Sequence, residues 1–185
     1  MKTRTLTLSA LSASLATVVL ILGTVFAEAL DLFAVIIAPV ILAMPLYIDS
    51  IKGSLLATLV AGILALLLTG FNIANLLYIS YFTFFGFFPI VKYYVMTRRK
   101  SKMLYYLLCC LWCVLAIIGI YYFYTAFLGL GLDLIIPISP SVMPFILAGV
   151  GVIVFFLMDA YVFATQIFMF KLLSRILKNK WVLWY

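Results

Sequence analysis

Two charged residues, Lys92 and Asp159, stand inside stretches of sequence that are otherwise apolar. A charge inside a membrane helix is costly, so such a residue is usually paired or beside water and marks a candidate functional site. Gln166 lies seven residues after Asp159 and therefore on the same face of a helix. We predict an intramembrane polar cluster of Lys92, Asp159 and Gln166 that joins the two helices carrying these residues.

The surroundings of Lys92 leave two interpretations open. It lies in FFGFFPIVKYYVMTRRK, six residues before Arg98, which is about 9 Å of helix. The long side chain could extend back to the cytoplasmic water, as basic side chains near helix ends commonly do. Because side chains lean toward the N-terminus of their helix, it could instead point toward the bilayer centre and reach Asp159. Pro89 removes a helical hydrogen bond nearby, so we expect a kink there.

The sequence contains few of the residue types that catalysis or metal binding requires. It contains no histidine and five acidic residues, which excludes a histidine-based metal site or general base. A single acid within the membrane lacks the second group of general acid–base catalysis, so we predict no enzyme, no catalytic residue, no metal and no cofactor. The stretch CCLWC holds Cys109, Cys110 and Cys113. Its possible roles are a metal or redox pair, palmitoylation of Cys109, or plain packing in a buried helix.

The composition predicts an all-α polytopic membrane protein. The 185 residues are 69% hydrophobic and 9% charged, whereas soluble domains are about half apolar and about a quarter charged. A membrane helix needs about 20 apolar residues, and the apolar stretches here are continuous rather than alternating. We predict one transmembrane domain over residues 1–185, a six-helix bundle. Its spans cover about residues 7–27, 32–48, 54–69, 76–96, 104–127 and 142–170.

Basic residues define the predicted orientation. They precede the first span, lie between the second and third and between the fourth and fifth, and follow the sixth. The other three connections together hold Glu28, Asp31 and Asp133 but no basic residue, so both termini are predicted to be cytoplasmic. The net charge of +7 then reflects topology, and we predict no nucleic-acid partner. Cleavage of the first span as a signal peptide after Ala27 is an alternative, although that span is longer than the usual signal core.

Aromatic and amphipathic segments fit this frame. Tyr105 and Tyr106 at the start of the fifth span are predicted to form an interfacial belt. Residues 171–185, KLLSRILKNKWVLWY, place basic residues on one helical face and leucines opposite. We predict that this tail lies along the cytoplasmic surface of the lipid bilayer.

Small residues recur every four positions in the first and third spans. Such stripes let helix backbones approach closely in lipid, either within the bundle or against another membrane protein. The residues predicted to dock a partner are Ala10, Ala13, Ser14, Ala57 and Ala61.

The extracellular side has a different composition. Asn72, Asn75, Tyr78 and Tyr81 stand at or near the start of the fourth span, and Asp133 lies in the loop LGLGLDLIIPISPS. These five residues are the predicted substrate-binding residues. Because acids but no basic groups lie on this side, a bound ligand would be neutral or cationic, and tyrosine rings would suit such a ligand. The alternative is that the acids face water and the tyrosines anchor the interface.

The layout of the chain resembles the substrate-capturing S component of energy-coupling factor (ECF) transporters. The resemblance rests on six spans, internal termini and the first span, MKTRTLTLSALSASLA, where serines replace several of the alanines of the family. The stretch FFGFFPIVK and an aspartate in the last span also resemble uncharacterised membrane proteins grouped with this family. The resemblance implies a bacterial cytoplasmic-membrane protein that binds a vitamin-like molecule from outside. It would then dock on a membrane T component driven by ATPase subunits. The amino-terminal histidine of nickel- and cobalt-specific relatives is missing, which argues against those metals as substrate.

A second function remains open. A scaffold membrane protein would use the same small-residue faces to bind other membrane proteins and would need no closed pocket.

Overall fold

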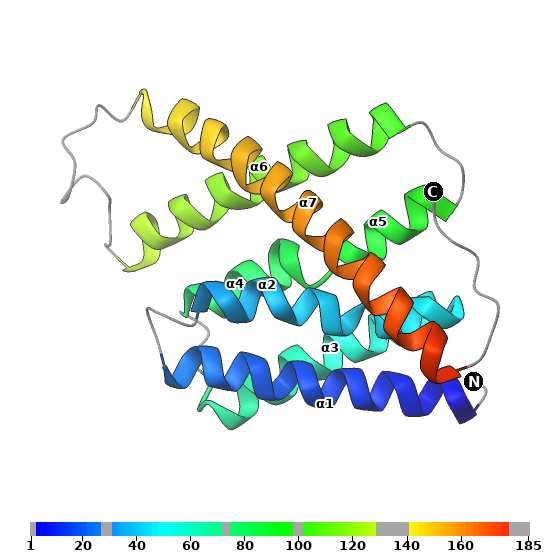
Figure 1. Cartoon of the computed structure of the whole chain (residues 1–185). Coiled ribbons are helices and arrows are strands. Elements are labelled where there is room, and N and C mark those ends of the chain that lie inside the picture. The colour runs from blue at the N-terminus through cyan, green and yellow to red at the C-terminus, as the bar shows by residue number, and fades with distance from the viewer. Residues whose placement is uncertain (1–2, 27–30, 72–74, 98–101, 129–140, 178–185) are drawn as a thin grey trace. The chain divides into compact units, whose positions relative to one another are not determined.

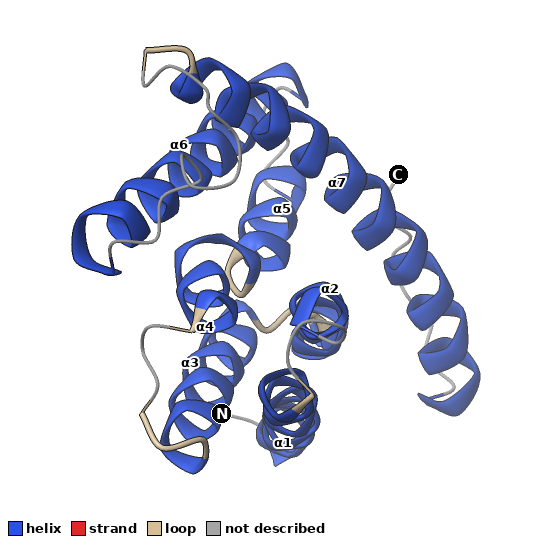
Figure 2. Cartoon of the chain, turned by 90° about the vertical axis from the view of Figure 1, so that its left-hand side faces the viewer, coloured by secondary structure: helices blue, strands red, loops and turns tan. Residues whose placement is uncertain are grey.

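A computed structural model describes residues 3–26, 31–71, 75–97, 102–128 and 141–177 of the chain (Figure 1). Within these ranges all regular structure is helical, as Figure 2 shows. Five helical stretches are long and apolar enough to cross a membrane, and a shorter apolar stretch covers Phe33–Ile48. The prediction of an all-α helical membrane protein is confirmed.

The helices overlap the predicted spans, and the last one ends at Leu177, seven residues after the predicted end of the sixth span. Their contacts divide the chain into two compact units. The first unit holds the helices of residues 1–100 and the part of the last helix from Ala160 on, and the second holds residues 101–159. The prediction of one transmembrane domain stays a prediction. The elements are α1 (Thr3–Val25), α2 (Asp31–Leu42), η1 (Met44–Ile48), α3 (Ile51–Leu68), α4 (Leu76–Ser80), η2 (Tyr81–Phe85), α5 (Phe88–Thr97), α6 (Lys102–Leu128) and α7 (Met143–Leu177).

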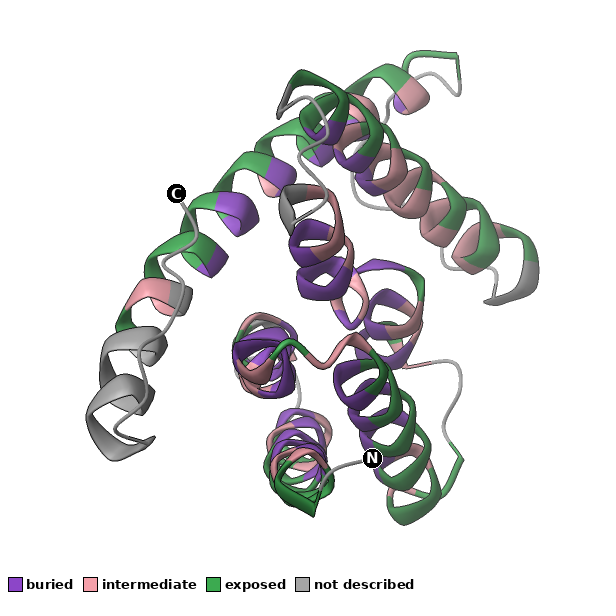
Figure 3. Cartoon of the chain, turned by 90° about the vertical axis from the view of Figure 1, so that its right-hand side faces the viewer, coloured by how far each residue is buried: buried purple, intermediate pink, exposed green. Residues whose placement is uncertain are grey.

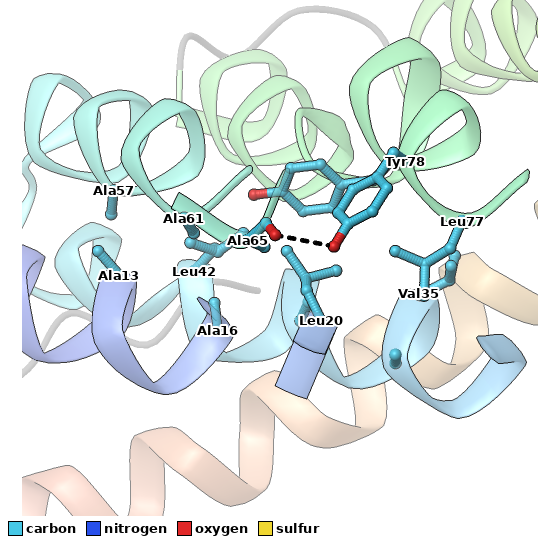
Figure 4. Packing of buried hydrophobic residues seen from close by; sticks show 13 residues of the cluster. Ala13, Ala16, Leu20, Val35, Leu42, Ala57, Ala61, Ala65, Leu77 and Tyr78 are labelled. Carbon is cyan, nitrogen blue, oxygen red and sulfur yellow. Dashed lines mark hydrogen bonds between the residues drawn. The ribbon is translucent and has the colours of Figure 1, made fainter. Parts of the chain in front are cut away.

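In the first unit, α1 packs against α3 through small side chains. Ala13 and Ala16 on α1 and Ala57, Ala61 and Ala65 on α3 are all buried in one core cluster. Figure 4 shows that the two rows face each other. Packing of backbones without large side chains between them is how helices associate in lipid.

Large apolar side chains lie on the opposite faces of these helices. Leu11 and Leu15 on α1 and Leu55, Leu59 and Ile63 on α3 are exposed. Figure 3 shows the separation of buried and exposed residues along the helices. A soluble protein would bury these faces, so their exposure agrees with a lipid environment.

The second span is shorter than the others because two prolines interrupt it. Pro39 lies inside α2, and Pro45 stands at the start of the 3₁₀ helix η1. The change of helix type leaves the carbonyl of Leu42 outside the α-helical pattern. The hydroxyl of Ser54 on α3 donates to this carbonyl at 2.6 Å, which satisfies a buried acceptor at the helix end.

The fourth span consists of three pieces. α4 leads into η2, a π-helix in which the N–H of Gly86 donates to the carbonyl of Tyr81, five residues back, at 2.9 Å. α5 begins at Phe88, and Pro89 follows in its first turn. The α-helical hydrogen-bond pattern is thus interrupted over the residues just before Pro89, and the predicted kink itself stays a prediction.

The second unit consists of α6 and the part of α7 up to Asp159. The two helices cross (Figure 1), and a Cβ added at Gly151 would lie 3.0 Å from the Cα of Val114. Tyr105, Cys109 and Cys113, spaced by four residues on α6, are buried. α7 continues unbroken to Leu177, so the predicted surface tail begins as a continuation of this helix.

Candidate functional site

The predicted substrate-binding tyrosines lie in the interior of the first unit. Tyr78 is 1% exposed, and its hydroxyl donates to the carbonyl of Ala65 at 3.1 Å and lies 2.8 Å from the hydroxyl oxygen of Thr69. Tyr81 is fully buried and donates to the carbonyl of Thr58 at 2.8 Å. Figure 4 shows Tyr78 pointing at α3. Both hydroxyl groups therefore bind the backbone of a neighbouring helix.

The other predicted substrate-binding residues have different positions. Asn75 is the N-cap of α4, where its side-chain oxygen accepts a hydrogen bond from the N–H of Leu77 at 2.8 Å. This contact satisfies one of the free amide groups at the start of the helix. Asn72 and Asp133 lie outside the described residues, so their part in a site stays a prediction.

The predicted docking residues fall into two sets. Ala13, Ala57 and Ala61 are at most 5% exposed and pack α1 against α3 within the first unit. Ala10 and Ser14 are exposed on the other side of α1. The buried set thus serves packing within the bundle, the alternative that the sequence left open. Of the five predicted docking residues, these two exposed ones are accessible to a partner.

Lys92 is a buried cation among the described residues of the first unit. It lies on α5 and is 2% exposed. Its side chain therefore does not extend into the cytoplasmic water. Its ammonium nitrogen lies 5.7 Å from the centre of the Phe163 ring on α7. An aromatic face attracts a cation, and the attraction is stronger where water is excluded. The break in the helix at residues 81–88 lies one turn before Lys92.

Asp159 is a buried acid among the described residues of the second unit. It is 8% exposed, and the hydroxyl of Tyr105 donates to its carboxylate at 2.6 Å. Tyr105 is 1% exposed, whereas its neighbour Tyr106 is 39% exposed, and their place in an interfacial belt stays a prediction. Sequence analysis missed this pair because adjacent tyrosines at a helix end fit the pattern of a belt. The signal that could have found it is the need of a buried carboxylate for a donor.

Tyr105 lies three residues after Lys102 in the first turn of α6. The hydrogen bond therefore places Asp159 of α7 beside the first turn of α6.

The predicted cluster of Lys92, Asp159 and Gln166 stays a prediction. Each of the two charged residues has a contact within its own unit, Lys92 with an aromatic ring and Asp159 with a phenol. Gln166 lies on α7, but its side chain is outside what the structure describes. Such groups can bind an ion or a polar solute, or hold helices together.

A further acid lies in the first unit, at the start of α2. Asp31 opens α2, and its Oδ1 atom is buried with no hydrogen-bond partner among the residues that the structure describes. Burial raises the pKa of this carboxyl group above its ordinary value, because a charged carboxylate is poorly solvated there. A Cβ added at Gly23 would lie 3.7 Å from this oxygen and 2.7 Å from Leu77 Cδ1, so α1, α2 and α4 meet at this point.

The described residues contain no group of three or more histidine, cysteine, aspartate or glutamate side chains that could hold a metal ion. Comparison of the chain with protein-family models, with curated proteins and with solved structures finds no match. Its function therefore has to be argued from its own residues.

Proposed function

We propose that this protein is a transport subunit of the membrane, one that captures a vitamin-like small molecule from outside the cell. In this proposal it is the substrate-capturing component of an ATP-driven importer of the ECF type in the bacterial cytoplasmic membrane. Its partners are a membrane T component and ATPase subunits, and it performs no catalysis itself.

One observation carries the proposal: a fully buried lysine follows a break in a membrane helix. Lys92 comes one turn after the interruption that η2, Gly86 and Pro89 make in the fourth span. Charged residues inside membrane helices commonly mark the pathways of solutes and ions. Interrupted helices are common in transporters, where they expose backbone groups to a cavity and divide a span into two parts.

The second span supports the proposal in the same way. It is short and contains Pro39 and Pro45, so two of the six apolar segments are interrupted. In transporters built from two repeated halves, short or Gly/Pro-interrupted hydrophobic segments at corresponding positions indicate the binding site. A protein that serves only as a rigid bundle has no need of either interruption.

A neutral or cationic ligand remains the expected one. Asp31 and Asn75 lie at the end of the first unit where α1, α2 and α4 meet, the predicted extracellular end. Since Tyr78 and Tyr81 use their hydroxyl groups inside the bundle, the polar groups for a ligand would come from these two residues together with Asn72 and Asp133.

Native mass spectrometry of the gently purified protein tests capture. We expect a small molecule bound in a ratio of one to one, which is released on unfolding and identified by its mass. Asp31→Asn should lower its occupancy, while Ser14→Ala, at an exposed position on α1, should leave it unchanged. An empty protein in every preparation, together with no uptake in cells that express it, would refute the proposal.

A scaffold protein is the second candidate, and the tyrosines favour it. Tyr78 and Tyr81 fill the interior of the first unit, as expected of a bundle without a closed ligand cavity. This function predicts that the protein co-purifies with other membrane proteins but with no ATPase subunit. Substitution of the exposed small residue Ala10 by leucine should then abolish the association.

A further inference from the structure

We propose that the first unit contains a binding site for a monovalent cation such as Na⁺, at the place where two interrupted spans meet α3. The ligands are the backbone carbonyls of Leu42 and Gly86 and the hydroxyl groups of Ser54 and Thr58. All four residues belong to the first unit. The proposal goes beyond the function proposed above, because neither the importer nor the scaffold requires such an ion.

The carbonyl of Leu42 ends α2 without a backbone donor. Pro45, three positions on, has no N–H, and the N–H of Leu46, four positions on, donates instead to the carbonyl of Ala43 at 2.9 Å. Among the described residues, the Leu42 carbonyl accepts one hydrogen bond, from the hydroxyl of Ser54 at 2.6 Å. Since a carbonyl oxygen has two lone pairs, one lone pair of Leu42 remains free.

The carbonyl of Gly86 in the fourth span lacks a backbone donor for the same reason. Pro89, three positions on, has no N–H, and the N–H of Ile90, four positions on, donates to the carbonyl of Phe87 at 3.1 Å. In the described part of the chain, the Gly86 carbonyl has one contact, with the hydroxyl of Thr58 at 3.4 Å. Hydrogen bonds between oxygen atoms are usually about 2.5–3.0 Å long, so this carbonyl is poorly satisfied.

Ser54 and Thr58 present their hydroxyl groups from one face of α3. The two residues are one helical turn apart, and both are fully buried. The proton of each hydroxyl goes to a carbonyl, and that of Thr58 is shared between Gly86 and the carbonyl of Ser54, at 3.0 Å. No described residue donates a hydrogen bond to either hydroxyl oxygen, so the lone pairs of both are free.

This group of oxygen atoms fits a cation. Its hydroxyl protons are already used, and what remains is a set of free lone pairs in a buried place. Hard cations bind through oxygen ligands, and backbone carbonyls by themselves replace the hydration shell of K⁺ in channel filters. In transporters, the carbonyls of unwound membrane helices coordinate Na⁺. Here two interrupted spans supply the carbonyls, and the uninterrupted α3 supplies the hydroxyl groups.

The charge of the ion follows from the ligands. Ca²⁺ and Mg²⁺ are bound largely through carboxylates, and this group contains none. Lys92 follows Gly86 by six residues, about 9 Å at the rise of a helix, and its positive charge repels a divalent ion more strongly than a monovalent one. If Na⁺ binds, the sequence-based prediction of no metal is wrong, because it considered only histidine, cysteine and acidic ligands.

Binding of radioactive Na⁺ to the full-length protein in lipid nanodiscs tests the site. Equilibrium dialysis in choline chloride, at constant ionic strength, should show saturable binding of one ion per chain. Loss of even an indirect partner of a metal typically costs about 10–100-fold in affinity. Ser54→Ala and Thr58→Val should therefore each raise the half-saturating Na⁺ concentration by about tenfold or more, whereas Thr58→Ser keeps the hydroxyl and should bind as the unaltered protein does.

Two buried hydroxyl groups of α1 serve as matched controls. Those of Ser12 and Thr17 each donate to a carbonyl of α1, at 3.0 Å and 2.8 Å. Ser12→Ala and Thr17→Val should leave the half-saturating concentration unchanged. An equal loss of binding in these controls would overturn the proposal, as would full binding in both Ser54→Ala and Thr58→Val.

Thermal unfolding of the unaltered protein is a second test that needs no variant. In sodium-free dodecyl maltoside, the unfolding midpoint should rise with added NaCl and reach a plateau, but should not rise with choline chloride, because an ion bound only by the folded state stabilises it. Absence of both this rise and saturable Na⁺ binding would overturn the proposal. Neither measurement involves uptake of a solute, so the outcome is independent of the importer.

Discussion

Replacement of Gly23 by alanine should destabilise the contact of α1 with α2. A Cβ at this position would lie 2.6 Å from the Cβ of Ala34 and 2.7 Å from Cδ1 of Leu77. Ordinary contacts between carbon atoms are about 3.5–4.0 Å, so the helices would have to separate by roughly 1 Å. The methyl group of Ala34 cannot rotate away, and Leu77 is 1% exposed and has little room.

The size of the effect follows from two opposing contributions. Overpacking a close contact costs about 1–3 kcal/mol, whereas glycine to alanine in a helix gains about 1 kcal/mol. Gly119→Ala is a matched control, because a Cβ at Gly119 meets nothing within 4 Å and only the gain applies. The free energy of unfolding should therefore be about 1–3 kcal/mol lower in Gly23→Ala than in Gly119→Ala.

Unfolding by sodium dodecyl sulfate in mixed micelles, followed by far-ultraviolet circular dichroism, measures this difference. The double variant Gly23→Ala/Ala34→Gly moves the methyl group from one helix to the other and should recover much of the loss. Equal stability of Gly23→Ala and Gly119→Ala would refute the close approach of α1 and α2 described above.

Three further predictions use the same titration. Tyr105→Phe should lower the free energy of unfolding by about 1 kcal/mol, the order measured for polar contacts between membrane helices. Tyr106→Phe should leave it unchanged. Equal effects of the two substitutions would refute the hydrogen bond between Tyr105 and Asp159. Ser54→Ala should also lower the free energy of unfolding by about 1 kcal/mol, because the carbonyl of Leu42 loses the hydroxyl donor of Ser54. An unchanged midpoint of the unfolding titration would contradict this. Since burial raises the pKa of Asp31, the folded state binds its proton more tightly than the unfolded state. The free energy of unfolding should therefore fall as pH rises from the ordinary carboxyl pKa through the raised one. Asp31→Asn should remove that fall, and a fall that persists in the variant would assign it to another group.

Several features of the fold could be predicted from the sequence because they depend on composition and on spacing along the chain. Long apolar runs can satisfy their backbone groups in lipid only as helices, and breaks in those runs set the helix ends. The stretch GFFP around Pro89 indicated an irregular fourth span. The four-residue spacing of Ala57, Ala61 and Ala65 indicated a close helix contact, and the structure shows α1 as the partner.

The partners of the polar groups could not be predicted in this way. Nothing in the sequence near Tyr105 distinguishes an interfacial tyrosine from one that donates to Asp159, because the choice depends on which residue of α7 lies opposite. Tyr78 and Tyr81 looked like the wall of a pocket, yet each hydroxyl binds a carbonyl of α3.

The sequence by itself determined that this is a helical membrane protein and roughly where its helices lie. Only the tertiary structure decided what each buried group contacts. Hydrophobicity and helix period act along the chain and are visible in the order of residues. The hydrogen bond of a buried phenol or carboxylate depends on the rotation and crossing of two helices, which packing between residues distant in sequence decides.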